Sequence, residues 1–306
     1  MHLQQLIDTF RHQIQLRNKA TAVLAVELLV TIIEESDANT IMDLNQQISE
    51  ATDEMKKVSR AISLTAGIAL FRKFVSRTSD EFDFQHCKSI FIDRGKQFVE
   101  HASNAKEVVS KSGPTLFLDG SVILTHGYSR VVCHLLACVA QQRQISVIVT
   151  ESSPMNNGYQ TAEFLINNGV PVSIIADSAV ASIMSKVTMV LLGADGITES
   201  GGIINQIGSC GICMIARHLG KSCYVAAESY KFTRLFPLDQ DDVEQYTEHS
   251  LYDTPYREDV DMEALYKLKE QKVVDYTPPQ LIDLLITDIG ILAPSAVSDE
   301  LIKLYV

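Results

Sequence analysis

The hydrophobic pattern of the chain changes once, near residue 112, and this change limits the folds that the chain can adopt. Before it, apolar residues recur every three or four positions in stretches covering residues 3–14, 22–33, 41–58 and 62–74. Such spacing places the apolar side chains on one face of a helix. Proline is absent from these stretches and glycine is nearly so, which favours unbroken helices. We therefore predict an N-terminal helical domain over residues 1–111.

After residue 112 the pattern consists of short apolar runs separated by helical stretches. The runs are Thr115–Leu118, Val122–Thr125, Ile145–Val149, Val172–Ile175, Met189–Leu192 and Cys223–Ala226. Runs of this kind are typical of parallel strands that are buried on both faces and joined by crossover helices. The predicted fold class is therefore α/β: the helical domain is followed by a Rossmann-like parallel-sheet domain over residues 112–306.

The charge balance excludes one broad class of partner. The 38 acidic residues outnumber the 26 basic ones, and the formal net charge of −12 repels a nucleic-acid backbone, so we expect no direct nucleic-acid binding. Acidic residues concentrate in 238–272, which we predict to be a solvated excursion from the second domain. A dedicated partner loop is the alternative for this stretch.

Charged residues near the start of the chain bear on its location in the cell. Charges between Asp8 and Glu27 interrupt any signal-peptide core, and no apolar run reaches the length of a membrane span. We expect a soluble, cytosolic protein that binds no membrane.

The six cysteines do not form the dense pattern of a small secreted scaffold. Cys210 and Cys213 have the spacing of a redox pair or of half a zinc site, but no second pair of Cys or His residues follows at a suitable distance. We favour the interpretation that the cysteines are reduced thiols in the core, and we expect no metal and no cofactor.

The last residues, from Ala296 to Tyr305, carry apolar side chains at helical spacing, which predicts a C-terminal helix. An apolar terminus must be covered, and two covers are open at this point. One is the core of the same chain, and the other is a second subunit.

The turns after the predicted strands are the places to search for a ligand site. In an open parallel sheet, ligands bind at the carboxyl ends of the strands, where helix N-termini present free backbone N–H groups to anions. Polar or small residues fill four of these turns, at 125–130, 150–154, 193–208 and 227–231. The candidate ligand-binding residues are His126, Ser129, Arg130, Glu151, Asp195, Gly201, Gly202, Asn205, Gln206 and Lys231. For Asp195 and His126, hydrogen bonding to the backbone is the alternative role.

The glycine-rich turn Gly193–Ser209 is the most specific motif of the chain. It combines Gly193-Ala-Asp-Gly with Gly201-Gly-Ile-Ile-Asn-Gln-Ile-Gly. This combination resembles the signature of the family that joins the regulatory subunits of translation initiation factor 2B with methylthioribose-1-phosphate and ribose-1,5-bisphosphate isomerases. The resemblance continues through 123–130, 225–237, 274–278 and 287–305, so it covers the second part of the chain and, less sharply, the first.

The isomerase branch of this family, as the resemblance implies, uses a cysteine and an aspartate to move a proton or hydride between neighbouring sugar carbons. Asp195 matches the aspartate and Asn205 matches a substrate-binding asparagine. The cysteine position falls on Gly127, which has no side chain to act as acid, base or nucleophile. Three further positions depart from the isomerase pattern, with Gln206 in place of Lys, Asn157 in place of Gln and Ser63 in place of Arg. We therefore predict no catalytic residue.

Two enzyme classes stand as alternatives. An isomerase that has moved its general acid to another residue could use Asp195 and His126 as the pair. A Rossmann-like dehydrogenase would need Gly-x-Gly-x-x-Gly after the first strand of the sheet, and the turns at 119–121 and 126–129 lack it. A pocket that has lost its catalyst can still bind a metabolite, so sugar-phosphate binding is a further hypothesis.

The closing segment 287–305 and the length of the chain resemble the alpha-subunit branch of the regulatory subunits. This resemblance implies a homodimer that joins two copies of the beta, gamma, delta and epsilon subunits into one assembly, with no nucleotide exchange by this chain itself. It also implies that the helical domain helps to recognise initiation factor 2 when the alpha subunit of that factor is phosphorylated.

Overall fold

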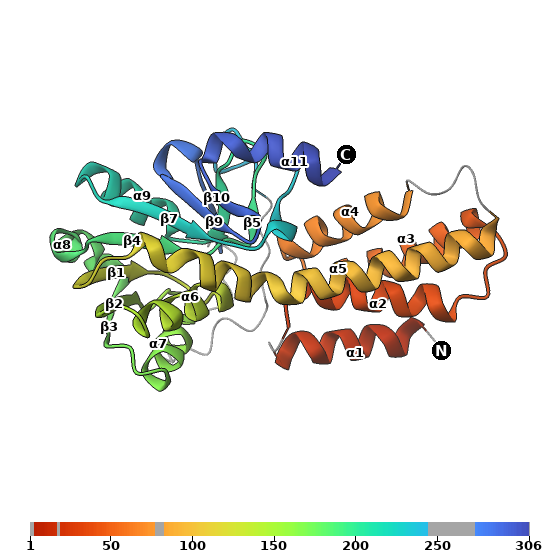
Figure 1. Cartoon of the computed structure of the whole chain (residues 1–306), viewed down its shortest axis with the longest axis horizontal. Helices are drawn as coiled ribbons and strands as arrows, with labels where there is room; N and C mark the ends of the chain where they lie inside the picture. Colours follow the sequence, from red (N-terminus) through yellow and green to blue (C-terminus); the bar gives the residue numbers. More distant parts are fainter. Residues whose placement is uncertain (1–2, 17–18, 77–82, 244–272, 306) are drawn as a thin grey trace, which may run out of the picture.

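The structure, a computed structural model, describes residues 3–16, 19–76, 83–243 and 273–305. The molecule is elongated, with helices at one end and a β-sheet flanked by helices at the other (Figure 1). This arrangement confirms the predicted fold class, a helical N-terminal region followed by a mostly parallel sheet. Among the described residues, no helix is long and apolar enough to cross a membrane.

Among the described residues, five helices build the helical end. They are α1 (Leu3–Leu16), α2 (Thr21–Glu35), α3 (Ile41–Val58), α4 (Ile62–Ser76) and α5 (Phe84–Ser112). Thr40 and Asp83 cap α3 and α5, because each side chain accepts a hydrogen bond from a backbone N–H in the first turn. Helix α2 packs against α1, α3, α4 and α5, which explains why ten of its fifteen residues are buried apolar residues.

Helix α5 connects the two ends of the molecule. It packs on α2 in the helical end and on α6 (Arg130–Ala140) and β9 (Leu284–Thr287) in the sheet end. Figure 1 shows it running along much of the molecule. Because one helix serves both ends, the limits 1–111 and 112–306 remain predictions.

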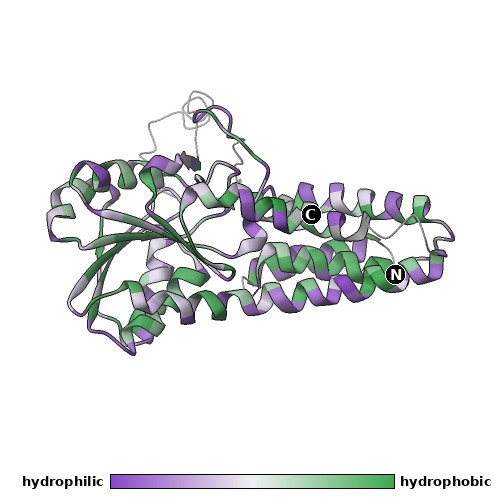
Figure 2. Ribbon diagram, turned by 45° about the horizontal axis from the view of Figure 1, so that its top comes forward, coloured by the Kyte–Doolittle hydropathy of each residue, from purple (hydrophilic) through white to green (hydrophobic). Residues whose placement is uncertain are grey.

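The main sheet has seven strands in the order β10-β9-β7-β4-β1-β2-β3. Besides β9, they are β1 (Ser121–Thr125), β2 (Ile145–Thr150), β3 (Val172–Ile175), β4 (Met189–Leu192), β7 (Ser222–Ala226) and β10 (Gly290–Leu292). All neighbours are parallel except β9 and β10. Helices α6, α7 (Gly158–Asn167), α8 (Val180–Ile183) and α9 (Ser209–His218) connect the strands. Figure 2 shows strands that are hydrophobic along most of their length, as expected when both faces are covered.

One predicted strand is wrong and one sheet was missed. Residues Gly113–Leu116 form a 3-10 helix, because Pro114 fixes φ and lacks a backbone N–H, so Thr115–Leu118 does not join the sheet. A second, three-stranded antiparallel sheet contains β5 (Gly196–Ile197), β6 (Ile203–Gln206) and β8 (Val274–Thr277). Most of the predicted acidic excursion, 238–272, lies outside the described residues.

The C-terminal helix, α11 (Val297–Tyr305), confirms the prediction of a helix at the end of the chain. Its apolar residues Val297 and Leu301 are buried in the main core, whereas Ile302 is 55% exposed. The helix packs against α4. Of the two possible covers, the core of the same chain therefore takes most of the apolar face.

Candidate functional site

A polar cavity of about 190 Å³ lies where the carboxyl ends of β1, β4 and β7 approach the starts of α2 and α4. Its lining residues are Ala20, Thr21, Ser63, Tyr128, Ser129, Arg130, Ala194, Asp195, Asn205, Glu228 and Lys231. Both ends of the molecule contribute to it. Five of the ten predicted ligand-binding residues line this cavity: Ser129, Arg130, Asp195, Asn205 and Lys231.

The carboxylate of Asp195 joins the sheet to the helical end. Its Oδ2 accepts a hydrogen bond from the backbone N–H of Ile62 at 2.8 Å, and its Oδ1 accepts one from the hydroxyl of Ser63 at 2.7 Å. Ile62 is the first residue of α4, so Asp195 caps this helix from across the cavity. Asp195 therefore has the alternative role, hydrogen bonding to the backbone, and it also lines the cavity.

Lys231, another lining residue, is held by a buried network. Its Nζ donates to the carbonyl of Ala194 at 2.9 Å and lies 2.9 Å from Oε2 of Glu228, whose other oxygen accepts from the hydroxyl of Tyr230. Burial alone would raise the pKa of Glu228, but the Lys231 ammonium, together with hydrogen bonds from the backbone and from Tyr230, keeps this pKa below its ordinary value. Because Lys231 is paired with Glu228, its positive charge is already neutralised within the chain.

Arg130 differs from Lys231 in having no such partner among the described residues. It is the first residue of α6, next to the N-cap Ser129, whose side chain accepts from the backbone N–H of Val132 at 3.5 Å. The Arg130 guanidinium has no hydrogen bond or ion pair with any residue in the part of the chain that the structure describes. A cation and the N-terminal residues of a helix therefore line the same cavity, which is an arrangement that favours anions.

His126, in contrast, does not line the cavity. Its ring is buried: Nε2 lies 2.8 Å from the carbonyl of Ile207 and Nδ1 lies 2.6 Å from the hydroxyl of Thr150. Because a carbonyl can only accept, Nε2 carries the proton and Nδ1 accepts from Thr150. Burial lowers the pKa of His126, so the ring is a neutral structural link.

Gln206 is also turned away from the cavity, toward Gly127. Its Nε2 donates to the carbonyl of Ser152 at 2.9 Å. Gly127 has φ of +74°, and a Cβ built there would lie 2.9 Å from Oε1 of Gln206. The Gln206 side chain thus fills the space that a side chain at position 127 would need.

Three further predicted residues lie outside the cavity lining. A Cβ at Gly201 would lie 2.1 Å from the carbonyl oxygen of Pro294, and one at Gly202 would lie 2.5 Å from the ring of Tyr276. These glycines permit close packing of the chain. Glu151 is half-buried, and its backbone N–H donates to the carbonyl of Ile175.

The N-terminus of α9, at the end of the glycine-rich turn, is occupied by a carboxylate of the chain itself. Oδ2 of Asp275, in β8, accepts hydrogen bonds from the backbone N–H groups of Gly208 at 2.8 Å and Cys210 at 3.0 Å. Burial raises the pKa of Asp275 to about 6, although both amides favour the charged form. An anion would have to displace Asp275 here, so the turn that is most distinctive in sequence leads into a capped helix.

Several lining residues are not among the predicted ligand-binding residues. Tyr128 and Glu228 lie inside two of the predicted polar turns, so their positions in the sequence could have identified them as lining residues. Thr21 comes from the helical end, where no strand-end rule applies. No group of three or more His, Cys, Asp or Glu side chains that could hold a metal occurs among the described residues.

The sequence matches the initiation factor 2 subunit family over residues 17–294, so the chain belongs to this family. It is 39% identical over 293 residues to a translation initiation factor eIF2B subunit alpha from Dictyostelium discoideum, covering 93% of this chain and 91% of that protein. It is 31% identical over 282 residues to a ribose 1,5-bisphosphate isomerase from Pyrococcus furiosus, covering 90% and 85%.

A solved structure shares the fold at lower sequence identity. The tetrameric eIF2B-beta2-delta2 complex from C. thermophilum contains a chain with a TM-score of 0.80 and 16% identity, covering 100% of this chain and 96% of that one.

Proposed function

We propose that this chain is a regulatory, non-catalytic subunit of the guanine-nucleotide exchange factor for translation initiation factor 2, and that it works in the cytosol. The observation that carries the proposal is the similarity to a protein named as an eIF2B alpha subunit over nearly the full length of both chains. The partners would be the beta, gamma, delta and epsilon subunits. The related structure of a beta–delta complex supports an assembly role for this fold.

Capture of an affinity-tagged chain from cell extract, followed by mass spectrometry, tests the proposal. We expect the other exchange-factor subunits to be recovered in equal amounts. Recovery of the tagged chain alone, under conditions that preserve the assembly, would overturn the proposal.

The competing function is sugar-phosphate isomerisation, favoured by the similarity to a ribose 1,5-bisphosphate isomerase. The local geometry argues against it. Gly127 supplies no reacting group, and Gln206 occupies the adjacent space. Asp195 lines the cavity while His126 lies outside its lining with both ring nitrogens engaged, so the alternative acid–base pair is not assembled. Incubation of the purified chain with ribose 1,5-bisphosphate or methylthioribose-1-phosphate should give no product above the blank, and clear turnover would favour the isomerase.

The homodimer is a further part of the proposal, and we place its contact on β3 and α8, at one end of the main sheet. We call it the β3–α8 face; its exposed residues are Pro171, Ser173, Ile174, Ala176, Ser178, Ala181, Ser182 and Ser185. Within 171–185 the only charged residue is Asp177, whose carboxylate accepts from the backbone N–H groups of Ser152 and Ser153. In a chain with 21% charged residues, an edge of this kind suits a self-complementary contact with a second copy.

The cavity supports a sugar-phosphate site in this regulatory subunit. Both carboxylates in its wall already have partners within the chain: Asp195 accepts from the start of α4, and Glu228 forms an ion pair with Lys231 and accepts from Tyr230. Arg130 and the first turn of α6 are left for the phosphate, and Asn205 lies among the lining residues that would meet sugar hydroxyls.

Recognition of phosphorylated initiation factor 2 by the helical end is the last part of the proposal, and it rests on the family resemblance. An assembly that contains this chain should retain the phosphorylated alpha subunit of the factor more strongly than the unphosphorylated one. An assembly prepared without the chain should lose that difference. Equal retention in both assemblies would remove this part of the proposal and leave the subunit role intact.

A further inference from the structure

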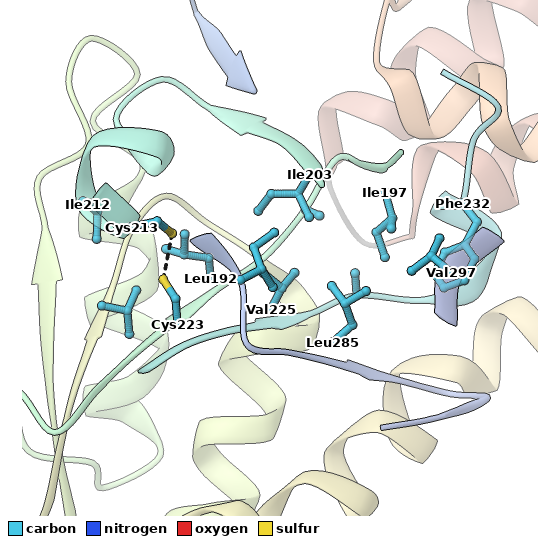
Figure 3. Close-up of a cluster of buried hydrophobic side chains, with 14 of the residues drawn as sticks. Leu192, Ile197, Ile203, Ile212, Cys213, Cys223, Val225, Phe232, Leu285 and Val297 are labelled. Carbon is cyan, nitrogen blue, oxygen red and sulfur yellow. Dashed lines mark hydrogen bonds between the residues drawn. The ribbon is translucent and has the colours of Figure 1, made fainter. Parts of the chain in front are cut away.

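Two buried cysteines meet between α9 and β7, away from the polar cavity. Sγ of Cys213, on α9, lies 2.7 Å from Sγ of Cys223, on β7 (Figure 3). Both residues are almost completely buried in the same hydrophobic cluster as Leu192 and Val225. Cys210, one helical turn before Cys213, is only partly buried. The sequence spacing had pointed to Cys210 and Cys213, but the fold gives Cys213 a different partner.

The backbone already holds these two sulfur atoms near bonding distance. Strand β7 is fixed by pairing with β4 and β9, and α9 packs on β4, β7 and β8. A disulfide bond has an S–S distance of about 2.0 Å, so the two sulfur atoms need to approach by only about 0.7 Å. Side-chain adjustment can supply such a movement without a change of fold.

We propose that Cys213 and Cys223 form an intramolecular disulfide bond when the protein is exposed to hydrogen peroxide, which cross-links α9 to β7. In the first step, one thiol is oxidised by peroxide to a sulfenic acid and one water is released. In the second, the other thiol attacks the sulfenic sulfur, the S–S bond forms and a second water leaves. Two electrons pass from the two sulfur atoms to one peroxide, and both thiol protons end in water.

The surroundings of the pair keep it reduced under mild conditions. The contact with Cys223 and the burial of the thiol both raise the pKa of Cys213 well above its ordinary value. The thiolate, which is the reactive form, is therefore scarce at neutral pH. Oxidation requires a local opening of α9, so it should be slow, and it should accelerate as the pH rises.

The cross-link would act on a helix that contacts one residue of the polar cavity. Ser209, the first residue of α9, accepts a hydrogen bond at 2.9 Å from the side-chain amide of Asn205, which lines the cavity. Fixing α9 to β7 would therefore restrict the helix whose Ser209 hydroxyl accepts from Asn205. It should also raise the melting temperature of the oxidised chain, and dithiothreitol should reverse the shift.

Peptide mapping of the full chain tests the proposal. The protein is treated with hydrogen peroxide, its remaining thiols are blocked in denaturant, and it is cleaved with trypsin. We expect a reducible link between peptides 187–217 and 222–231, and the loss of two of the six thiols. Because peptide 187–217 also contains Cys210, the matched control is Cys210→Ser, which should retain the link, whereas Cys213→Ser should lose it.

Three results would overturn the proposal. They are six free thiols after peroxide treatment, a link that disappears in Cys210→Ser, and oxidation to sulfinic acid with no cross-link. If Cys213→Ser does not fold, the thiol count of the unsubstituted chain and the map of Cys210→Ser still decide between these outcomes.

Discussion

The hydroxyl of Ser63 donates a hydrogen bond of 2.7 Å to Asp195, although the two residues are 132 positions apart in the chain. The other carboxylate oxygen accepts from the first backbone N–H of α4. This carboxylate therefore fixes the helical end to the sheet at the edge of the cavity. Its importance can be measured as stability, independently of any ligand.

Asp195→Ala should lower the free energy of unfolding by about 1–2 kcal/mol, because α4 loses its cap and Ser63 loses its partner. Urea unfolding followed by circular dichroism gives this value. Asp195→Asn retains one acceptor oxygen and should lose less. Equal stability of the alanine variant and the unsubstituted chain would contradict the capping role.

Arg130→Gln should weaken sugar-phosphate binding about ten-fold or more, because one charge-assisted contact to phosphate contributes about 1.5–3 kcal/mol. Calorimetric titration with ribose 1,5-bisphosphate measures the affinity. Arg143→Gln is the matched control, since Arg143 is an exposed arginine outside the cavity lining. No heat from the unsubstituted chain at millimolar ligand would remove the sugar-phosphate hypothesis altogether.

The sequence predicted the elements whose apolar pattern is long or cleanly bounded. The four helical stretches and five of the six strand runs occur in the structure, because periodic burial leaves its mark on every turn or pair of residues. The run Thr115–Leu118 failed because it is only four residues long and follows Pro114. Strands β5 and β6 were missed because both are short and glycines precede β6, and their partner β8 comes from a distant part of the chain.

Half of the predicted ligand-binding residues line the cavity, and the reason is geometric. The rule for strand ends found the right turns, and these turns supply residues such as Ser129 and Arg130. The rule does not say which way a side chain points, so His126 and Gln206 were included although they face other parts of the protein. Thr21 comes from the helical end, and one sequence contains no signal for that long-range contact.

Ile174→Glu should convert the proposed dimer into a monomer, because it places a charge on the β3–α8 face, where Ile174 is 41% exposed. Sedimentation velocity at micromolar concentration measures the change. Ile302→Glu makes the same substitution on α11 at a residue that is 55% exposed, and it should leave the dimer intact. If only Ile302→Glu gives a monomer, the interface lies on the C-terminal helix instead. If the unsubstituted chain is itself a monomer, neither surface is a dimer interface.

Asp275→Asn should change the free energy of unfolding more favourably at neutral pH than in acid. The pKa of Asp275 rises from 3.8 to about 6 on folding, so the native state binds its proton more tightly than the unfolded state does. For such a group, the unsubstituted chain loses stability as the pH rises from about 4 to about 6, and the loss is complete above pH 6. Asparagine does not ionise, and its oxygen can still accept from the N–H groups of Gly208 and Cys210.

The difference in unfolding free energy, Asp275→Asn minus the unsubstituted chain, should therefore increase by about 2–3 kcal/mol between pH 4 and pH 7, since one pKa unit corresponds to about 1.4 kcal/mol. Urea unfolding of both proteins across this range measures it, and taking the difference cancels the titration of all other carboxylates. A difference that stays constant with pH would mean that Asp275 ionises as easily in the fold as in water. In that case its carboxylate would cap α9 at no cost from burial.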